Sequence, residues 1–164
     1  MKHHYGAAIV FLAAAFSSAF AAETVDIREW EVPYENSRPR DPYAQSADSI
    51  WFVGQVGGYV GHLDPSTGTI VKYDLPEGEG PHNLIVGEDG IVWYAGNRTG
   101  VIGRFDPKTK EIEEIAMPDE AARDPHTLVF DKDEKNIWFT VQGGNFLGRL
   151  NIETREVDLI ASKT

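Results

Sequence analysis

The sequence predicts an all-β protein built from β-propeller blades, and three observations carry this prediction. A unit recurs three times, over residues 40–79, 80–123 and 124–164, and its equivalent residues are about 42 to 45 positions apart. Each unit divides into four short, strand-like segments separated by turn residues. No window beyond the N-terminal segment shows sustained helical periodicity. Four short antiparallel strands in a repeat of this length are typical of one propeller blade.

Several landmarks keep their register across the three units. Each unit opens with a proline followed by an aromatic residue or a histidine, at Pro42-Tyr43, Pro81-His82 and Pro125-His126. A Trp-aromatic pair comes next, at Trp51-Phe52, Trp93-Tyr94 and Trp138-Phe139. Ten residues after each Trp stands a glycine, and Asp or Asn and then Thr follow it at intervals of three residues: Gly61, Asp64, Thr67; Gly103, Asp106, Thr109; Gly148, Asn151, Thr154. We therefore expect the three tryptophans to occupy equivalent, largely buried positions between adjacent sheets.

The second unit shows the strand pattern most clearly. Residues 83–86 and 91–95 are predicted to form two strands joined at Asp89-Gly90, a dipeptide typical of hairpin turns. A third strand is expected over residues 101–105 and a more charged outer strand over 111–117. The turn between them contains Asp106-Pro107, in which proline presets the backbone and aspartate caps it.

The outer-strand pattern also occurs once before the first unit, at residues 27–33. Residues 22–39 are therefore expected to contain the outer strand of an incomplete blade, near residues 27–32, followed by a linker. Propellers typically have about four to eight blades. Three and a quarter blades thus predict the N-terminal portion of a longer ring. The alternative is a chain that completes its ring by pairing with a second copy, because open blade edges favour self-association.

The first 21 residues have the pattern of a signal peptide. A weakly basic start precedes an apolar run over residues 6–16, which is shorter than a membrane-spanning helix requires. Ala19-Phe20-Ala21 fits a signal-peptidase site with small residues, so cleavage after Ala21 is expected. The sequence therefore predicts export to the periplasm or beyond, with no membrane attachment after cleavage.

Composition excludes several classes of function. The formal net charge is −11, with 26 acidic residues against 15 Lys and Arg, so nucleic acid and anionic membranes are poor partners. The absence of cysteine removes disulfides, thiolate metal sites and cysteine nucleophiles. A hydrophobic content of 41% with four tryptophans predicts a packed core.

The repeat contains three short patterns: Pro-His-x-(Leu/Ile), Asp-Gly-x-(Val/Ile)-Trp-(Phe/Tyr) and (Ile/Val)-Gly-(Arg/His)-(Leu/Phe)-Asp-Pro-x-Thr. In this combination the chain resembles the streptogramin B lyases, also called virginiamycin B lyases. The resemblance covers essentially the whole chain after the signal peptide. It implies a seven-bladed propeller and a carbon–oxygen lyase that opens a cyclic depsipeptide lactone by elimination. In such a mechanism a His removes the proton α to the ester carbonyl, and a carboxylate-bound Mg²⁺ polarises that carbonyl.

The resemblance transfers only in part to individual residues. It implies His126 and His82 as candidate bases and Asp124, two residues before His126, as a candidate Mg²⁺ ligand. In the third unit Val141 stands where the family has a second acid. In the second unit Gly80 and Gly96 replace the two acids, and in the first unit Tyr43 takes the histidine position and Gly54 that of the second acid. No unit carries the full set, so we expect this chain to bind Mg²⁺ weakly and to be inactive as a lyase by itself.

A small-molecule ligand is the expected partner, bound at the mouth of the propeller channel. His82 and His126 are expected to point toward one shared polar face there, with Asp124 close to His126. The candidate substrate-binding residues are Tyr43 and the polar residues that follow the second strand of the later units, Asn97, Arg98, Gln142 and Asn145.

Three alternatives remain open at this point. The histidines can equally form a blade-to-blade hydrogen bond that recurs because the repeat recurs. The protein can be a non-catalytic binding propeller. A lactonase-type propeller hydrolase is a further alternative, but it needs several acidic and Asn metal ligands around the channel, and the sequence offers few acids besides Asp124.

Overall fold

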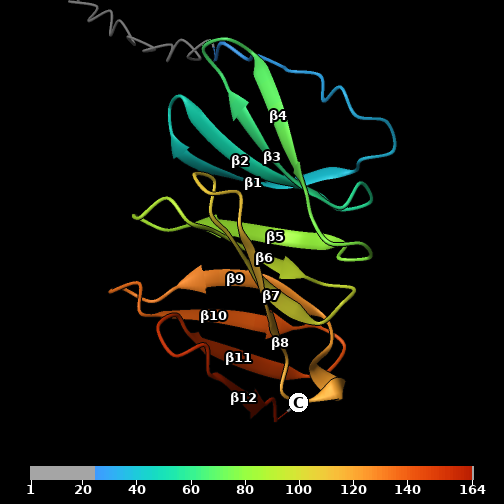
Figure 1. Cartoon of the computed structure of the whole chain (residues 1–164), viewed down its shortest axis with the longest axis vertical. Helices are drawn as coiled ribbons and strands as arrows, with labels where there is room; N and C mark the ends of the chain where they lie inside the picture. Colours follow the sequence, from blue (N-terminus) through green and yellow to red (C-terminus); the bar gives the residue numbers. More distant parts are fainter. Residues whose placement is uncertain (1–24, 164) are drawn as a thin grey trace, which may run out of the picture.

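The computed structural model describes residues 25–163, which form twelve strands in three four-stranded antiparallel sheets. The three sheets are stacked in chain order (Figure 1). The prediction of an all-β protein made of four-stranded blades is confirmed. The helical content of this described range is a single 3₁₀ turn, η1 (Glu120–Ala122). The predicted signal peptide lies outside the described residues, and within residues 25–163 no helix is long and apolar enough to cross a membrane.

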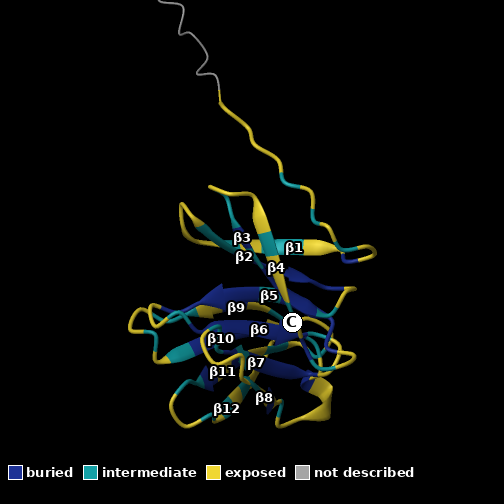
Figure 2. Ribbon diagram, turned by 45° about the horizontal axis from the view of Figure 1, so that its top comes forward, coloured by how far each residue is buried: buried dark blue, intermediate teal, exposed yellow. Residues whose placement is uncertain are grey.

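Each sheet is a meander, in which consecutive strands are hydrogen-bonded neighbours. The first sheet contains β1 (Pro39–Ser46), β2 (Ser49–Gly54), β3 (Tyr59–Asp64) and β4 (Thr69–Asp74). The second contains β5 (Pro81–Val86), β6 (Val92–Gly96), β7 (Val101–Phe105) and β8 (Ile112–Ala116). The third contains β9 (Pro125–Phe130), β10 (Asn136–Val141), β11 (Phe146–Asn151) and β12 (Val157–Ala161). Figure 2 shows the middle sheet as the most buried, with the outer strands β4 and β12 largely exposed.

The recurring glycine accommodates an aromatic ring from the neighbouring strand. Phe52, Tyr94 and Phe139 pair across their strands with Gly61, Gly103 and Gly148. A Cβ atom added at Gly103 would lie 1.9 Å from Cζ of Tyr94, so the ring occupies the space of the missing side chain. This contact explains why the aromatic residue and the glycine recur together at a fixed spacing.

The recurring Asp or Asn closes the turn between the third and fourth strands of each blade. Oδ1 of Asp64 accepts a hydrogen bond from the backbone N–H of Ser66 at 2.8 Å. Asp106 accepts from Lys108 N at 2.8 Å and Asn151 from Glu153 N at 3.0 Å in the same way. Side-chain acceptors of this kind stabilise a turn because they replace a backbone acceptor two residues away.

A repeated tryptophan packs between two sheets only where the next blade along the chain covers it. Trp51 lies in the core between the first and second sheets, and Trp93 in the core between the second and third. They are 5% and 2% exposed. Trp138 is half-buried, so the prediction of equivalent burial holds for Trp51 and Trp93 but not for Trp138. Its side of the third sheet has no described sheet packed on it, and Val129, Leu147 and Ile160 are also exposed there.

The segment before the first sheet does not form the predicted strand at residues 27–32. A strand needs a neighbouring strand for its backbone hydrogen bonds. The blade that this segment was expected to complete is not among the described residues, so the segment has no such neighbour there. Trp30 and Val32 instead pack on the side of the first sheet that carries Phe52. The Tyr34 hydroxyl donates a hydrogen bond to the carbonyl oxygen of Ile70 at 3.2 Å and fixes the segment on that side.

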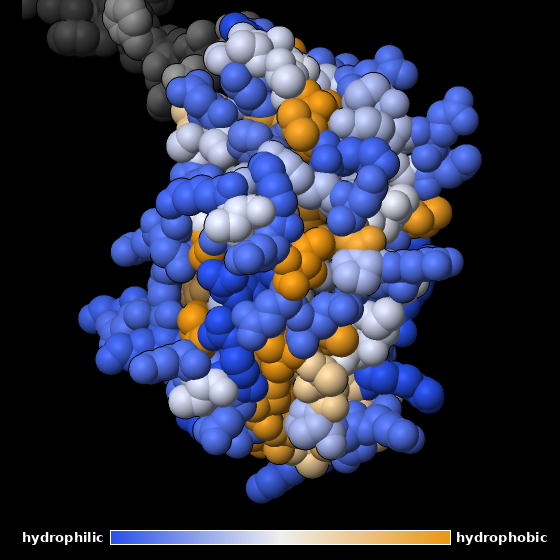
Figure 3. All heavy atoms as spheres, viewed as in Figure 1, coloured by the Kyte–Doolittle hydropathy of each residue, from blue (hydrophilic) through white to orange (hydrophobic). Residues whose placement is uncertain are grey.

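Surface hydropathy is uneven on the side shown in Figure 3. Hydrophobic side chains emerge there in small patches and a narrow band between hydrophilic ones. This distribution fits sheets that bury their apolar faces against one another and expose charged loops.

Candidate functional site

The inner strands of the three sheets bring their first residues together. β1 contacts β5, and β5 contacts β9, so the start of each blade lies beside the start of the next. Hydrogen-bond register pairs Pro39 with Gly54, Pro81 with Gly96 and Pro125 with Val141. The residues that follow these prolines are therefore equivalent: Arg40, His82 and His126.

The first blade thus places Arg40, and not Tyr43, at the histidine position. Tyr43 lies three residues further along β1, opposite Trp51. The sequence assignment is wrong because Pro42-Tyr43 imitates the opening pair of the later units. Spacing to the tryptophan identifies the correct residue, since Arg40 and His82 each precede their Trp by eleven residues.

His82 and His126 form the centre of the site. Their ring centroids are 3.5 Å apart and the rings are tilted by 39°, so the expectation of a shared face is confirmed. His82 is buried, and His126 is half-buried with its Nδ1 3.0 Å from the hydroxyl of Thr127. Burial lowers the pKa of His82 to about 4, and electrostatic repulsion from the neighbouring His126 and Arg40 adds to this effect. His82 is therefore uncharged at neutral pH.

One carboxylate joins this pair to Arg40. Oδ2 of Asp41 lies 3.4 Å from Nδ1 of His82 and accepts a hydrogen bond from Nε of Arg40 at 3.2 Å. The Arg40 guanidinium also donates to Oε1 of the buried Gln55 at 3.0 Å. Sequence reasoning missed both Arg40 and Asp41, because it aligned the first blade three residues too late.

Asp124 makes its side-chain hydrogen bond with the turn after β10. Its Oδ2 accepts a hydrogen bond from the backbone N–H of Gly143, and within residues 25–163 no ion pair joins it to His126. Asp124 instead lines a cavity of about 330 Å³ between the second and third sheets, together with Asn97, Arg98 and Arg123. Asn97 Nδ2 donates to the carbonyl oxygen of Pro125 at 3.1 Å and so connects this cavity to the start of β9.

The remaining candidates are dispersed. Tyr43 lines a different cavity of about 430 Å³ with Gln45, Val86 and Glu88. Gln142 and Asn145 are exposed in the turn between β10 and β11. The structure therefore gathers Asn97, Arg98 and Asp124 in one place and leaves Tyr43 outside it.

The residues present do not fit Mg²⁺. Within the described part of the chain, no three His, Cys, Asp or Glu residues form a group that could hold a metal ion. Asp41 is already paired with Arg40, and Asp124 shares its cavity with Arg98 and Arg123. Mg²⁺ prefers octahedral oxygen ligands, and guanidinium neighbours repel it.

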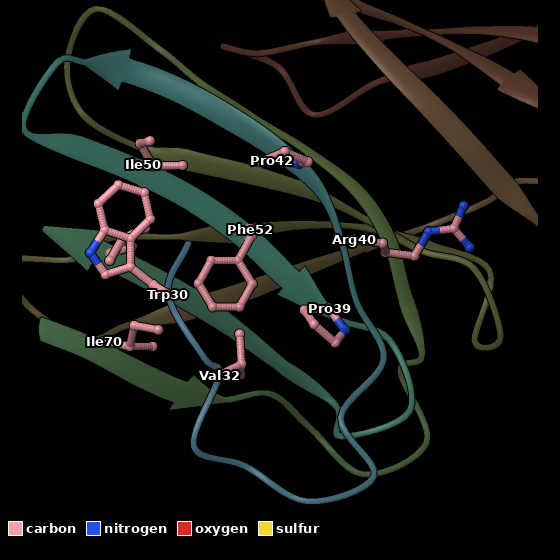
Figure 4. Close-up of a pocket in the computed structure, with 9 residues that line it drawn as sticks. Trp30, Val32, Pro39, Arg40, Pro42, Ile50, Phe52 and Ile70 are labelled. Carbon is pink, nitrogen blue, oxygen red and sulfur yellow. The ribbon is translucent and has the colours of Figure 1, made fainter. Parts of the chain in front are cut away.

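A separate apolar pocket of about 220 Å³ lies on the outer side of the first sheet. Figure 4 shows Trp30 and Val32 facing Phe52, Ile50 and Ile70 across it. Arg40 is its one charged lining residue. The equivalent side of the second sheet is covered by Trp51 of the first, so this pocket belongs to blade packing rather than to the polar site.

Three stacked four-stranded meanders, with inner strands that begin at a common polar cluster, define a part of a β-propeller. The chain belongs to the virginiamycin B lyase family, whose sequence pattern matches residues 23–161.

Individual relatives agree with this assignment. A virginiamycin B lyase of Nocardia farcinica is 40% identical over 50 residues, which is 30% of this chain and 18% of that protein. Among solved structures, a streptogramin B lyase superposes with a TM-score of 0.74 at 31% identity, covering 84% of this chain and 45% of that one. A catalytically inactive virginiamycin B lyase from Staphylococcus aureus with quinupristin gives a TM-score of 0.75 at 28% identity, covering 84% and 46%. The chain therefore spans less than half the length of these relatives.

Proposed function

We propose that this chain is the ligand-binding portion of an exported, streptogramin-lyase-like propeller. It binds a small molecule at the end of the sheets where β1, β5 and β9 begin, and its own residues do not complete the elimination chemistry. The contact between His82 and His126 carries this proposal, because two imidazoles meet where β5 and β9 begin in a chain of the virginiamycin B lyase family.

The described residues support binding better than catalysis. An effective general base needs a pKa near the working pH, whereas the pKa of His82 is lowered to about 4. The positions for a second acid hold Gly96 and Val141, which cannot bind a metal. Elimination with Mg²⁺, a seven-bladed ring and export by residues 1–21 are the further parts of this proposal, and they concern the whole protein.

Binding and ring opening can be measured separately on residues 22–164. Calorimetric titration with quinupristin tests binding, and mass spectrometry of a streptogramin B lactone incubated with protein and Mg²⁺ tests chemistry. We expect binding without ring opening. Elimination would leave the mass unchanged and shift the retention time, whereas hydrolysis would add one water.

Matched variants locate the binding. His82→Ala with His126→Ala should weaken quinupristin binding at least tenfold, while His62→Gln, on β3 of the first sheet, should leave it within twofold. Absence of quinupristin binding, or equal binding by the double variant, contradicts the proposal. Ring opening that disappears in His126→Ala would assign the catalytic base to this part of the propeller.

A further inference from the structure

Two arginines line the cavity between the second and third sheets, and in the described part of the chain neither forms an ion pair. Arg98 comes from the turn after β6 and Arg123 from the connection before β9, and both are exposed. Within residues 25–163 neither side chain takes part in an ion pair or a hydrogen bond, although the protein carries a net charge of −11. By contrast, Arg40 and Arg155 are held by carboxylates. Because the chain has more acidic than basic residues, most arginines could find a carboxylate partner. Two unpaired guanidinium groups in one cavity therefore suggest that a ligand is their partner.

The same cavity offers a buried acceptor. Oδ1 of Asp124 is inaccessible to water and has no hydrogen-bond partner among the described residues, while Oδ2 is engaged by Gly143. A buried carboxylate oxygen without a donor is costly, so a ligand N–H that displaced the atoms covering Oδ1 would relieve this cost. Two guanidinium groups and one acceptor together match a carboxylate that has a neighbouring amide N–H, which is the chemistry of a peptide chain end.

The cavity adjoins the histidine pair. Asn97 is hydrogen-bonded to Pro125, the residue before His126. A Cβ atom at Gly80, two residues before His82, would lie 2.5 Å from Cδ of Arg98. A ligand that reaches the two imidazoles can therefore place a charged end between Arg98 and Arg123.

We propose that Arg98 and Arg123 form a subsite for the carboxylate of a ring-opened, linear depsipeptide. The inference rests on the proposed function only in the choice of ligand class. In C–O elimination a base takes the proton α to a carbonyl, the Cα–Cβ double bond forms, and the Cβ–O bond breaks with its electron pair on the departing ester oxygen. The product carries a carboxylate that the intact lactone lacks. The subsite therefore binds the opened form more tightly than the ring.

Three probes test the subsite by calorimetric titration of residues 22–164: an intact streptogramin B lactone, the linear acid obtained by opening its ester, and the methyl ester of that acid. We expect the acid to bind at least tenfold more tightly than its methyl ester. The combined variant Arg98→Gln and Arg123→Gln should abolish this difference, so that the acid and its methyl ester bind equally. Arg149→Gln, which removes an exposed arginine on β11, should retain the difference.

The outcomes separate this inference from the proposed function. Binding of the acid but not of the lactone supports the subsite and contradicts the proposed function. Binding of the lactone with equal affinities for acid and methyl ester contradicts the subsite alone. Failure of all three probes, or displacement of the acid by inorganic phosphate at equal concentration, overturns the assignment to a peptide carboxylate. Both arginines are exposed, so the thermal unfolding midpoint of the double variant should match that of the wild type.

Discussion

Trp93 and Trp138 occupy equivalent positions in the second and third sheets, yet their surroundings differ. Trp93 is 2% exposed between two sheets, and Arg155 of the third blade lies 5.5 Å from its ring centroid. Trp138 has the same strand position but no described sheet over it, and it is half-buried. The repeat therefore determines which way a side chain points, whereas the next blade determines whether that side chain is buried.

The largest expected effect is at the covered tryptophan. Trp93→Ala should lower the free energy of unfolding by about 3–5 kcal/mol, because it opens a cavity in the core between the second and third sheets. Urea unfolding followed by far-UV circular dichroism measures this change. If Trp93→Ala is too unstable to purify, Trp93→Phe can replace it. Trp93→Phe should lower the free energy of unfolding by less than Trp93→Ala but by more than Trp138→Ala. A loss below about 1 kcal/mol for Trp93→Ala would contradict the packing described.

A second difference between blades concerns the residue two positions before the opening proline. In the first blade it is Ser37, which accepts a hydrogen bond from the Tyr59 hydroxyl at 2.8 Å. In the second it is the fully buried Glu79, which accepts one from the Thr99 hydroxyl at 3.1 Å. Burial raises the pKa of Glu79 from 4.5 to about 8, and the neighbouring Glu114 carboxyl adds to this effect.

This difference predicts a pH dependence of stability. Protonated Glu79 contributes stability that is fully present below pH 4.5 and is lost as pH rises through about 8. The loss amounts to at most about 1.4 kcal/mol per pH unit within that window. Glu79→Gln stays neutral and should flatten the dependence between these limits. Glu77→Gln, at an exposed neighbour, is the matched control, and a Glu79→Gln profile parallel to the wild type would refute the assignment.

The segment before the first sheet should contribute less than the core between sheets. Trp30→Ala should cost about 1–2 kcal/mol, because the half-buried indole covers only part of the Phe52 side. Binding of the hydrophobic dye ANS should increase as that side becomes exposed. Arg28→Ala, two residues away and exposed, should change neither quantity.

The smallest effect is expected at Trp138. Trp138→Ala should cost less than about 1 kcal/mol, since no cavity forms on an open side. The comparison with Trp93→Ala under identical conditions is the decisive measurement. Equal losses at the two positions would mean that another sheet covers Trp138 in solution.

Most of the fold could be predicted from sequence because its determinants are local. The aromatic–glycine pairs and the Asp or Asn turns are contacts within one blade, and their spacing repeats in the sequence. The burial of Trp138 and the pairing of residues 27–32 depend on neighbouring sheets, so local patterns cannot decide them. The site was only partly predictable: His82 and His126 follow from the repeat, but Asp41 contacts His82 from another blade. The two prolines of β1 also concealed the equivalence of Arg40.

The two ends of the stack are unequal. Trp30 and Val32 act as a cap on the first sheet, whereas the third sheet presents Val129, Leu147 and Ile160 to solvent. A head-to-tail contact between copies would join unlike surfaces, and contacts of that kind produce rings or open filaments rather than two-fold dimers. Each junction would first have to displace the cap. The cap would therefore add a free-energy cost to such a head-to-tail junction, in the way that a terminal repeat limits the growth of a solenoid.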